Sequence, residues 1–91
     1  MKQGIHLIVK GEVQGVNFRY YTQRKARSLG ITGSVRNLPD GDLEIFAEGE
    51  EMQLMDLAVW AKVGSPSSFV DEVITEKREY DGKWFDFHID E

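Results

Sequence analysis

The chain has no cysteine, and this absence excludes several kinds of chemistry at once. It can form neither a disulfide nor a thiolate metal site, and it has no cysteine nucleophile. Histidine is also scarce, since His6 and His88 are the only two and lie in separate strand-like segments. A metal site needs several converging ligands, so the sequence predicts no metal ion. The lack of cysteine favours the cytoplasm, because disulfides belong to oxidising compartments.

Long apolar runs are missing as well. No stretch approaches the ~20 apolar residues of a membrane span, and residues 1–4 do not lead into the apolar segment of a signal peptide. The sequence therefore predicts neither a membrane segment nor a secretion signal. Its 91 residues are expected to form one domain, residues 1–91, with a single core of modest size.

Acidic residues are absent from one long segment of the chain. Residues 13–39 contain no Asp or Glu and carry five cations: Arg19, Arg24, Lys25, Arg27 and Arg36. The rest of the chain holds six cations and all sixteen anions, and the net charge is −5. Such a protein is a poor general binder of nucleic acid but is suited to holding a small anion. Arg24, Lys25 and Arg27 are more simply explained as the solvated face of a helix.

The pattern of apolar and polar residues predicts the order of the secondary structure. Alternation with period two favours strands over residues 5–10, 31–36 and 43–48. The charged, β-branched segment 70–80 predicts a fourth strand, and residues 84–89 are expected to form a short last one. Helical periodicity favours helices over residues 18–29 and 52–63. The resulting βαββαβ order is that of a ferredoxin-like α+β sandwich. It comprises a four-stranded antiparallel sheet with two helices on one face and a short C-terminal strand.

The second predicted helix follows a strand that Gly49 is expected to end. Apolar residues three or four positions apart predict its buried face. These are Met52, Met55, Val59 and Val63, and the stripe is widened by Leu54, Leu57 and Trp60.

The most informative stretch is Gly11-Glu12-Val13-Gln14-Gly15-Val16-Asn17-Phe18-Arg19, which joins the first strand to the first helix. Its two glycines let the backbone curl, so that main-chain N–H groups can surround an anion. The predicted phosphate-binding loop comprises Glu12, Val13, Gln14, Gly15, Val16, Asn17 and Phe18. It is not a P-loop, because the Gly-Lys-Ser/Thr ending is missing.

Arg19 stands where the first helix begins, and a cation there opposes the helix dipole at a cost of ~0.3–1 kcal/mol. An anion between Arg19 and the free N–H groups would remove this penalty. The planar guanidinium also matches two phosphate oxygens. Taken alone, Arg19 could equally be an ordinary surface arginine.

Asn37 is expected near Arg19 although it lies eighteen positions further along the chain. A twelve-residue helix covers roughly 18 Å, and a seven-residue strand returns over roughly 23 Å. Asn37 also has the parity of Gly33 and Val35, which places it on the helix-covered face of the sheet. The alternative is a turn residue before Leu38, since asparagine favours turns.

No obvious base or nucleophile accompanies these residues. Ser65, Ser67 and Ser68 surround a proline and belong to no nucleophile motif. A phosphate monoester usually needs a metal, nucleophile or acid, whereas a mixed carboxylic–phosphoric anhydride expels a carboxylate that needs no proton. Its hydrolysis requires positioning, charge neutralisation and an oriented water. The loop, Arg19 and Asn37 could supply these three things.

Two motifs together resemble the paired signature of the acylphosphatases: Gly11-x-Val13-Gln14-Gly15-Val16-x-Phe18-Arg19 and Gly33-x-Val35-x-Asn37-x-x-x-Gly41. The resemblance implies a monomeric enzyme without metal or cofactor that hydrolyses acyl phosphates to a carboxylate and inorganic phosphate. Phosphate would be product and competitive inhibitor. The family's arginine, which binds phosphate, maps onto Arg19, and its asparagine, which positions the attacking water, maps onto Asn37. The loop from Glu12 to Phe18 would provide the backbone cradle.

One departure from the family concerns the C-terminus. Many relatives end with an aromatic and a basic residue, whereas this chain ends Phe87-His88-Ile89-Asp90-Glu91. It therefore has no evident terminal group to support Arg19.

Two alternatives stay open at this point. One is a module for carbamoyl phosphate of the kind found in larger hydrogenase-maturation proteins, for which the chain is short. The other is a non-catalytic ferredoxin-like binding module for RNA or a small effector. Sheet-based RNA binders stack bases on exposed aromatic residues, but the strands here offer Phe46 between glutamates in an acidic chain.

Overall fold

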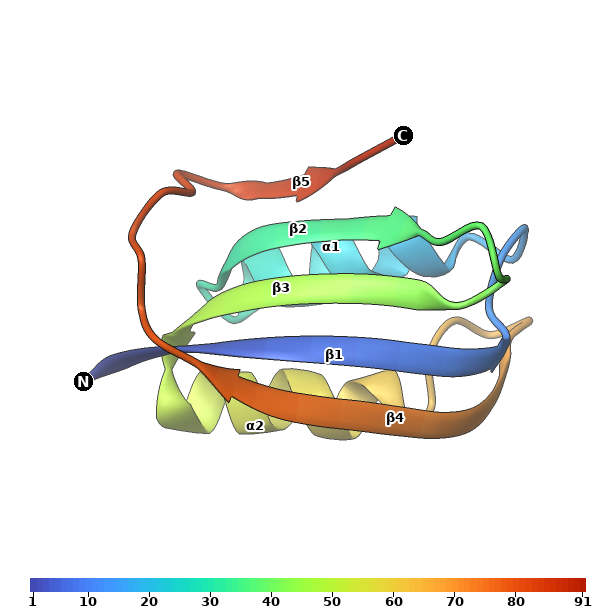
Figure 1. Ribbon diagram of the computed structural model, residues 1–91, viewed down its shortest axis with the longest axis horizontal. Coiled ribbons are helices and arrows are strands. Elements are labelled where there is room, and N and C mark those ends of the chain that lie inside the picture. Colours follow the sequence, from blue (N-terminus) through green and yellow to red (C-terminus); the bar gives the residue numbers. More distant parts are fainter.

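The computed structural model describes residues 1–91, which form two helices packed on one five-stranded sheet (Figure 1). In chain order the elements are β1 (Lys2–Glu12), α1 (Phe18–Ser28), β2 (Thr32–Asn37), β3 (Leu43–Glu50), α2 (Glu51–Ala61), β4 (Phe69–Arg78) and β5 (Phe87–Ile89). Neither helix has the length and apolar character needed to cross a membrane.

The sheet confirms the predicted ferredoxin-like topology and adds one detail. Its strand order is β4-β1-β3-β2-β5, and the first four strands pair antiparallel. The short last strand joins the same sheet at the edge and runs parallel to β2. The sheet is therefore mixed and five-stranded, and the C-terminal segment lies beside β2 (Figure 1).

The helix-covered face of the sheet forms the core. Leu7, Ile45 and Val35 lie opposite one another on β1, β3 and β2, and none of the three is exposed to solvent. Their neighbours in sequence point to the other face, as period-two alternation requires. The positions predicted to face the core on the first three strands are buried, but Ser34 and Glu48 at alternate positions are buried as well.

The predicted buried face of α2 is confirmed only in part: Leu54 and Leu57 are buried and Trp60 packs against the core, but the main stripe is not buried. Met52, Met55, Val59 and Val63 are 61–77% exposed, whereas Leu54, Leu57 and Ala61 face the core. Both sets of residues have helical spacing, so periodicity cannot say which one is buried.

The junction between β3 and α2 explains which face is buried. Gly49 does not end the strand, because β3 continues to Glu50 and α2 starts at the next residue. Glu50 caps α2, and its main-chain N–H donates to Gln53 Oε1 at 3.0 Å. With no loop between the elements, the direction of β3 fixes the rotation of the helix and turns Leu57 inward.

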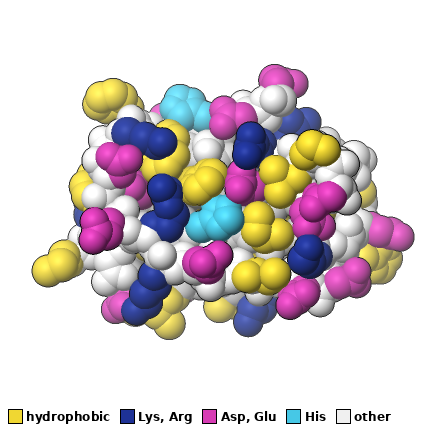
Figure 2. All heavy atoms as spheres, in the orientation of Figure 1, with side chains coloured by type: hydrophobic (Ala, Val, Ile, Leu, Met, Phe, Trp, Pro, Cys, Tyr) yellow, Lys and Arg dark blue, Asp and Glu magenta, His cyan; other side chains and the backbone are white.

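The opposite face of the sheet carries charged and polar side chains interspersed with hydrophobic ones (Figure 2). At its centre Glu44 lies 2.9 Å from His6 Nε2 and accepts a 2.7 Å hydrogen bond from Arg36 Nε. Burial raises the pKa of Glu44, but these two partners outweigh it and hold the pKa below its ordinary value of 4.5.

A buried carboxylate on this face holds the long connection from β4 to β5. Glu48 is 2% exposed, and its two oxygens accept the main-chain N–H groups of Asp81 and Gly82 at 2.7 and 2.9 Å. The connection passes from one edge of the sheet to the other (Figure 1). Glu48 thereby fixes the route by which the chain reaches β5.

Candidate active site

The loop between β1 and α1 has the backbone curl that its glycines predict. Gly15 has a φ of 74°, and Asn17 has a φ of 61°, the only positive φ outside glycine in the chain. Asparagine is one of the few residues that adopt this left-handed conformation readily. The two positions together turn the chain from the end of β1 into the start of α1.

The first turn of α1 presents unpaired amides. Asn17 occupies the N-cap position, yet no side chain there accepts a hydrogen bond from the helix, and the first turn contains no acidic residue. The first N–H groups of a helix have no partner within it. Together with the helix dipole, they favour an anion at this end.

Two other parts of the molecule hold the loop in place. The buried Ser65 donates from Oγ to the main-chain oxygen of Val16 at 2.8 Å. Gln14 donates from Nε2 to the main-chain oxygens of Leu38 and Asp42 at 2.7 and 2.9 Å. The segment after α2 and the turn between β2 and β3 thus both fix the loop. Sequence reasoning missed both contacts, because each joins residues at least 24 positions apart.

Close packing behind the loop fixes the start of α1. Phe18 is buried and meets Trp60 edge-on, with 5.5 Å between the ring centroids. Gly64 passes directly over the Phe18 ring, where an added Cβ would lie 2.4 Å from Cε2. The glycine that ends the α2 segment is therefore required by the position of Phe18, the neighbour of Arg19.

These elements enclose a pocket of about 360 Å³. Its lining residues are Val13, Gly15, Asn17, Phe18, Arg19, Tyr20, Asn37, Ile89 and Glu91. The structure thus brings Arg19 and Asn37 to one place, from the start of α1 and the end of β2. Asn37 pairs with Leu43 and shares the helix-covered face with Val35, as the parity of β2 predicts.

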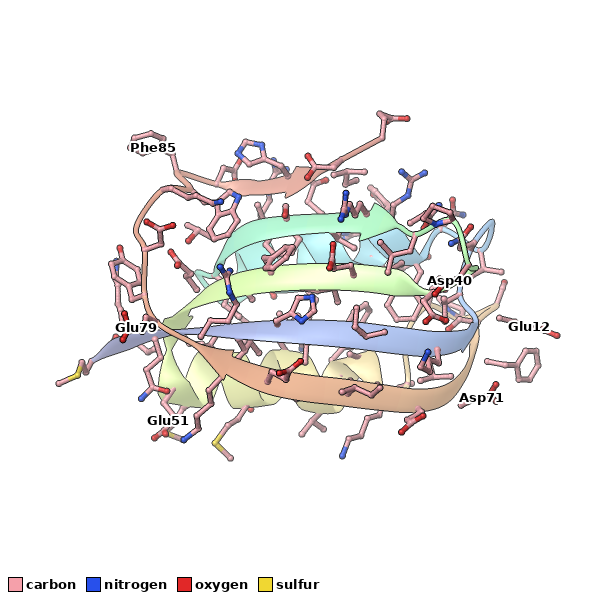
Figure 3. The ribbon with its side chains drawn as sticks, in the orientation of Figure 1. Glu12, Asp40, Glu51, Asp71, Glu79 and Phe85 are labelled. Carbon is pink, nitrogen blue, oxygen red and sulfur yellow. The ribbon has the colours of Figure 1, made fainter.

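Three of the seven predicted loop residues do not line the pocket. Glu12 lies at the far end of β1 and points away from the molecule (Figure 3). Gln14 and Val16 make the supporting contacts described above. Of the four that do line it, Val13 and Phe18 have side chains that are 1% exposed, so they belong to the core as well. Arg24, Lys25 and Arg27 lie outside the pocket.

Arg19 is held by a main-chain group and has no carboxylate partner. Its Nη1 donates to the carbonyl oxygen of Asp90 at 3.0 Å, and it forms no ion pair. The N–H of Asp90 in turn donates to the carbonyl oxygen of Val35 at 2.9 Å. The segment after β5 therefore supplies the support for Arg19 that the terminal residue types did not suggest. The guanidinium charge stays free for an anion.

Contacts between α1 and β5 stabilise this arrangement. Gln23 Nε2 donates to the carbonyl oxygen of Phe87 at 2.9 Å. Arg27 donates from Nε and Nη2 to the two carboxylate oxygens of Asp86 at 3.1 and 2.7 Å. These hydrogen bonds from Arg27 lower the pKa of Asp86. Arg27, which the sequence placed on a solvated face, thus anchors the segment that supports Arg19.

Asn37 carries an unsatisfied group. Its Oδ1 is buried and has no hydrogen-bond partner, the only such side-chain atom in the chain. A buried acceptor without a partner costs ~1–3 kcal/mol. A bound molecule with an O–H or N–H group would satisfy it.

The fold and this pocket define a class: a ferredoxin-like α+β protein with an anion-binding loop, an unpaired arginine and an asparagine that lacks a partner. The sequence model of the acylphosphatase family matches residues 5–89. The chain therefore belongs to the acylphosphatase family.

Individual relatives agree with this assignment. The acylphosphatase of Marinobacter nauticus is 50% identical over 82 residues, which cover 90% of this chain and 89% of its own. The crystal structure of acylphosphatase from Bacillus subtilis has a TM-score of 0.94 and 36% identity, with both chains fully covered. The fold also occurs in the crystal structure of full-length HypF, with a TM-score of 0.86 and 29% identity, where it corresponds to 12% of that chain.

The family assignment settles the activity. The protein is an enzyme that hydrolyses the carboxyl–phosphate bond of acyl phosphates, which gives a carboxylate and inorganic phosphate. A non-catalytic binding module is not favoured.

Proposed function

We propose that Arg19 and the amides at the start of α1 hold the phosphoryl group of the substrate, and that Asn37 orients the attacking water. The observation that carries this proposal is the unpaired Oδ1 of Asn37, in the pocket that Arg19 also lines. A buried acceptor without a donor from the protein fits an O–H group of the attacking water. The free guanidinium fits the phosphoryl oxygens.

The reaction then needs no acid at the leaving group. The water oxygen, held by Asn37, attacks phosphorus as the bond from phosphorus to the acyl oxygen breaks. The acyl oxygen leaves as a carboxylate, and the water proton passes to a phosphoryl oxygen. Arg19 and the helix amides stabilise the negative charge on the phosphoryl group. Catalysis consists of positioning and electrostatics.

Release of phosphate from benzoyl phosphate in the presence of a chelator tests these roles. Removing one preorganised contact typically lowers the rate by about 10²–10³. Arg19→Ala is expected to abolish phosphate binding and turnover, and Asn37→Ala to lower kcat by that factor with little change in KM. Lys25→Ala is the matched control, since it removes a charge from the same helix outside the pocket.

Turnover close to wild type in a folded Asn37→Ala variant would rule out the assigned role of Asn37. Loss of activity in Lys25→Ala as large as that in Arg19→Ala would show that the general charge of α1, rather than the pocket, matters.

We further propose that the enzyme acts as a monomer and that inorganic phosphate inhibits it competitively. The first point stays a prediction from the sequence. The support for the second is that the product retains the phosphoryl oxygens that Arg19 would bind. A cytoplasmic location stays a prediction from the lack of cysteine.

A further inference from the structure

The peptide group between Val16 and Asn17 is held by one side chain from a distant part of the chain. Ser65 Oγ donates to the carbonyl oxygen of Val16 at 2.8 Å. This is the only hydrogen bond that the main chain of residues 13–16 makes. We propose that Ser65 is a positioning residue of the phosphoryl site, which turns the N–H of Asn17 toward the bound anion, an inference that rests on the proposed function.

The geometry of the peptide group carries the effect of Ser65 to Asn17. A trans peptide group is planar, and its C=O and N–H bonds point in opposite directions. Gly15 and Asn17 line the pocket, whereas Val16 and Ser65 do not. The Val16 carbonyl is turned toward Ser65, so the N–H of Asn17, in the same peptide group, is turned the other way. This N–H donates to no group of the protein and is free for a ligand.

The backbone conformation at the start of α1 brings further amides to the same place. Asn17 is left-handed, with φ 61° and ψ 22°, and Phe18 is the first residue of the right-handed helix. Successive residues of opposite hand form a concave nest in which neighbouring N–H groups converge on an anion. The N–H groups of Asn17, Phe18 and Arg19 therefore converge, and Asn17 adds one amide to those at the helix end.

Ser65 is itself fixed in place. It is 2% exposed, and its carbonyl oxygen accepts hydrogen bonds from the N–H and the Oγ of Ser68 at 3.0 and 2.7 Å. The N–H of Gly64 donates to the carbonyl oxygen of Trp60 at 2.9 Å, which attaches this turn to the end of α2. A side chain can position another group only when its own surroundings hold it, and Ser65 meets this condition.

Loss of the Ser65 hydroxyl should weaken binding of the phosphoryl group more than it slows the chemical step. Without this hydrogen bond, the N–H of Asn17 is no longer held toward the anion. The amides contact the phosphoryl group in substrate and product alike, and loss of such uniform binding raises KM while kcat is kept. Ser65→Ala should raise KM for benzoyl phosphate and Ki for inorganic phosphate by about three- to tenfold, the effect of one neutral hydrogen bond, and change kcat by less than about twofold.

The same turn offers a matched control. Ser67→Ala makes the same change at an exposed serine that forms no side-chain hydrogen bond and lies outside the pocket. KM, Ki and kcat should stay at their wild-type values in this variant. Ser65→Cys keeps the shape of the side chain but replaces the hydroxyl with a weak donor. It should change KM and Ki in the same direction as Ser65→Ala, and it serves if the alanine variant does not fold.

A ¹H–¹⁵N NMR titration with inorganic phosphate observes the Asn17 amide itself. In wild type the amide protons of Asn17, Phe18 and Arg19 should move downfield as phosphate binds. In Ser65→Ala at saturating phosphate, the displacement of the Asn17 signal should be smaller, while the signals of Phe18 and Arg19 keep theirs. A role of Ser65 in stability alone would leave all three displacements at saturation unchanged.

Three results would overturn the inference. One is a Ki for phosphate in Ser65→Ala that equals that of wild type or is raised equally in Ser67→Ala. Another is a fall in kcat with KM and Ki unchanged, since Ser65 would then act on the attacking water. The third is an Asn17 amide signal in wild type that does not respond to phosphate.

The variant Arg19→Ala separates the two proposals. If Arg19→Ala loses phosphate binding while Ser65→Ala binds phosphate as tightly as wild type, only the role of Ser65 is refuted. If Arg19→Ala binds phosphate and hydrolyses benzoyl phosphate as wild type does, the proposed function fails, and the role of Ser65 falls with it.

Discussion

At the scale of single residues, the backbone at a few positions decides the shape of the pocket. Gly64 and Gly30 both have a φ of 74°, a value that favours glycine. They differ in their surroundings. A Cβ at Gly64 would lie 2.4 Å from the Phe18 ring, whereas at Gly30 the nearest atom is the end of Gln53 at 3.5 Å. The pair therefore separates backbone strain from crowding behind the pocket.

Gly64→Ala should lower the free energy of unfolding by roughly 2–4 kcal/mol, the sum of left-handed strain and overpacking. Gly30→Ala should cost about 1–2 kcal/mol, because only the strain applies. Urea unfolding measures both losses of free energy, provided that the slope of unfolding free energy against urea concentration is the same in both variants and in wild type. Equal losses of unfolding free energy in the two variants would mean that the Phe18 ring moves aside for the added Cβ at no cost.

Only part of the site could be predicted from residue types along the chain. Arg19 and Gly15 could be predicted as site residues. A glycine loop that leads into a helix, with an arginine in the first turn of that helix, is typical of an anion site. Ser65 could not be predicted, since its partner Val16 is 49 positions away and serine in a helix-ending loop is common. The support of Arg19 could not be predicted at all, because a main-chain carbonyl at Asp90 provides it and any residue type has one.

At the scale of elements, the direct junction of β3 and α2 controls what α2 buries. Helical spacing alone predicted one wide buried face, a main stripe through Met55 and Val59 that is widened by residues such as Leu57. The preceding strand β3 decides which residues of α2 face the core, and the direction of β3 cannot be read from the spacing of apolar residues. Three large apolar residues, Met52, Met55 and Val59, consequently remain on the outer face of α2, and Val63 just beyond its end is exposed too.

Two substitutions on α2 distinguish its faces. Leu57→Ala should cost about 2–5 kcal/mol of unfolding free energy, because Leu57 is fully buried. Met55→Ala should change it by less than about 0.5 kcal/mol, because Met55 is 61% exposed. Thermal or urea unfolding compares the two. A larger loss in Met55→Ala than in Leu57→Ala would contradict the observed orientation of α2.

At the scale of the whole molecule, the two faces of the sheet have different tasks. The helix-covered face supplies the core and, at the end of β2, the asparagine of the pocket. The open face ties β1, β2 and β3 together through Glu44 and holds the connection to β5 through Glu48. The support of Arg19 by the C-terminal segment therefore depends on groups that lie on the far side of the sheet.

The open face should make the protein sensitive to acid. The pKa of Glu44 is lowered in the folded state, so the stability it contributes is present above about pH 4.5 and is lost as the pH falls through the folded pKa. Glu44→Gln should therefore destabilise the protein at pH 7 and flatten the decline of unfolding free energy below pH 4.5. Urea unfolding at several pH values measures this. Parallel curves for wild type and variant would contradict it.

The opposite placement of the two chain ends has a practical consequence for attachment. Residue 91 lies at the rim of the pocket, whereas residue 1 lies at the other end of β1 (Figure 1). A tag, linker or fused partner joined after Glu91 would leave the molecule at the pocket that Arg19 lines and would obstruct it. One joined before Met1 would leave in the opposite direction. Immobilisation through the N-terminal end would keep the catalytic pocket turned toward solution.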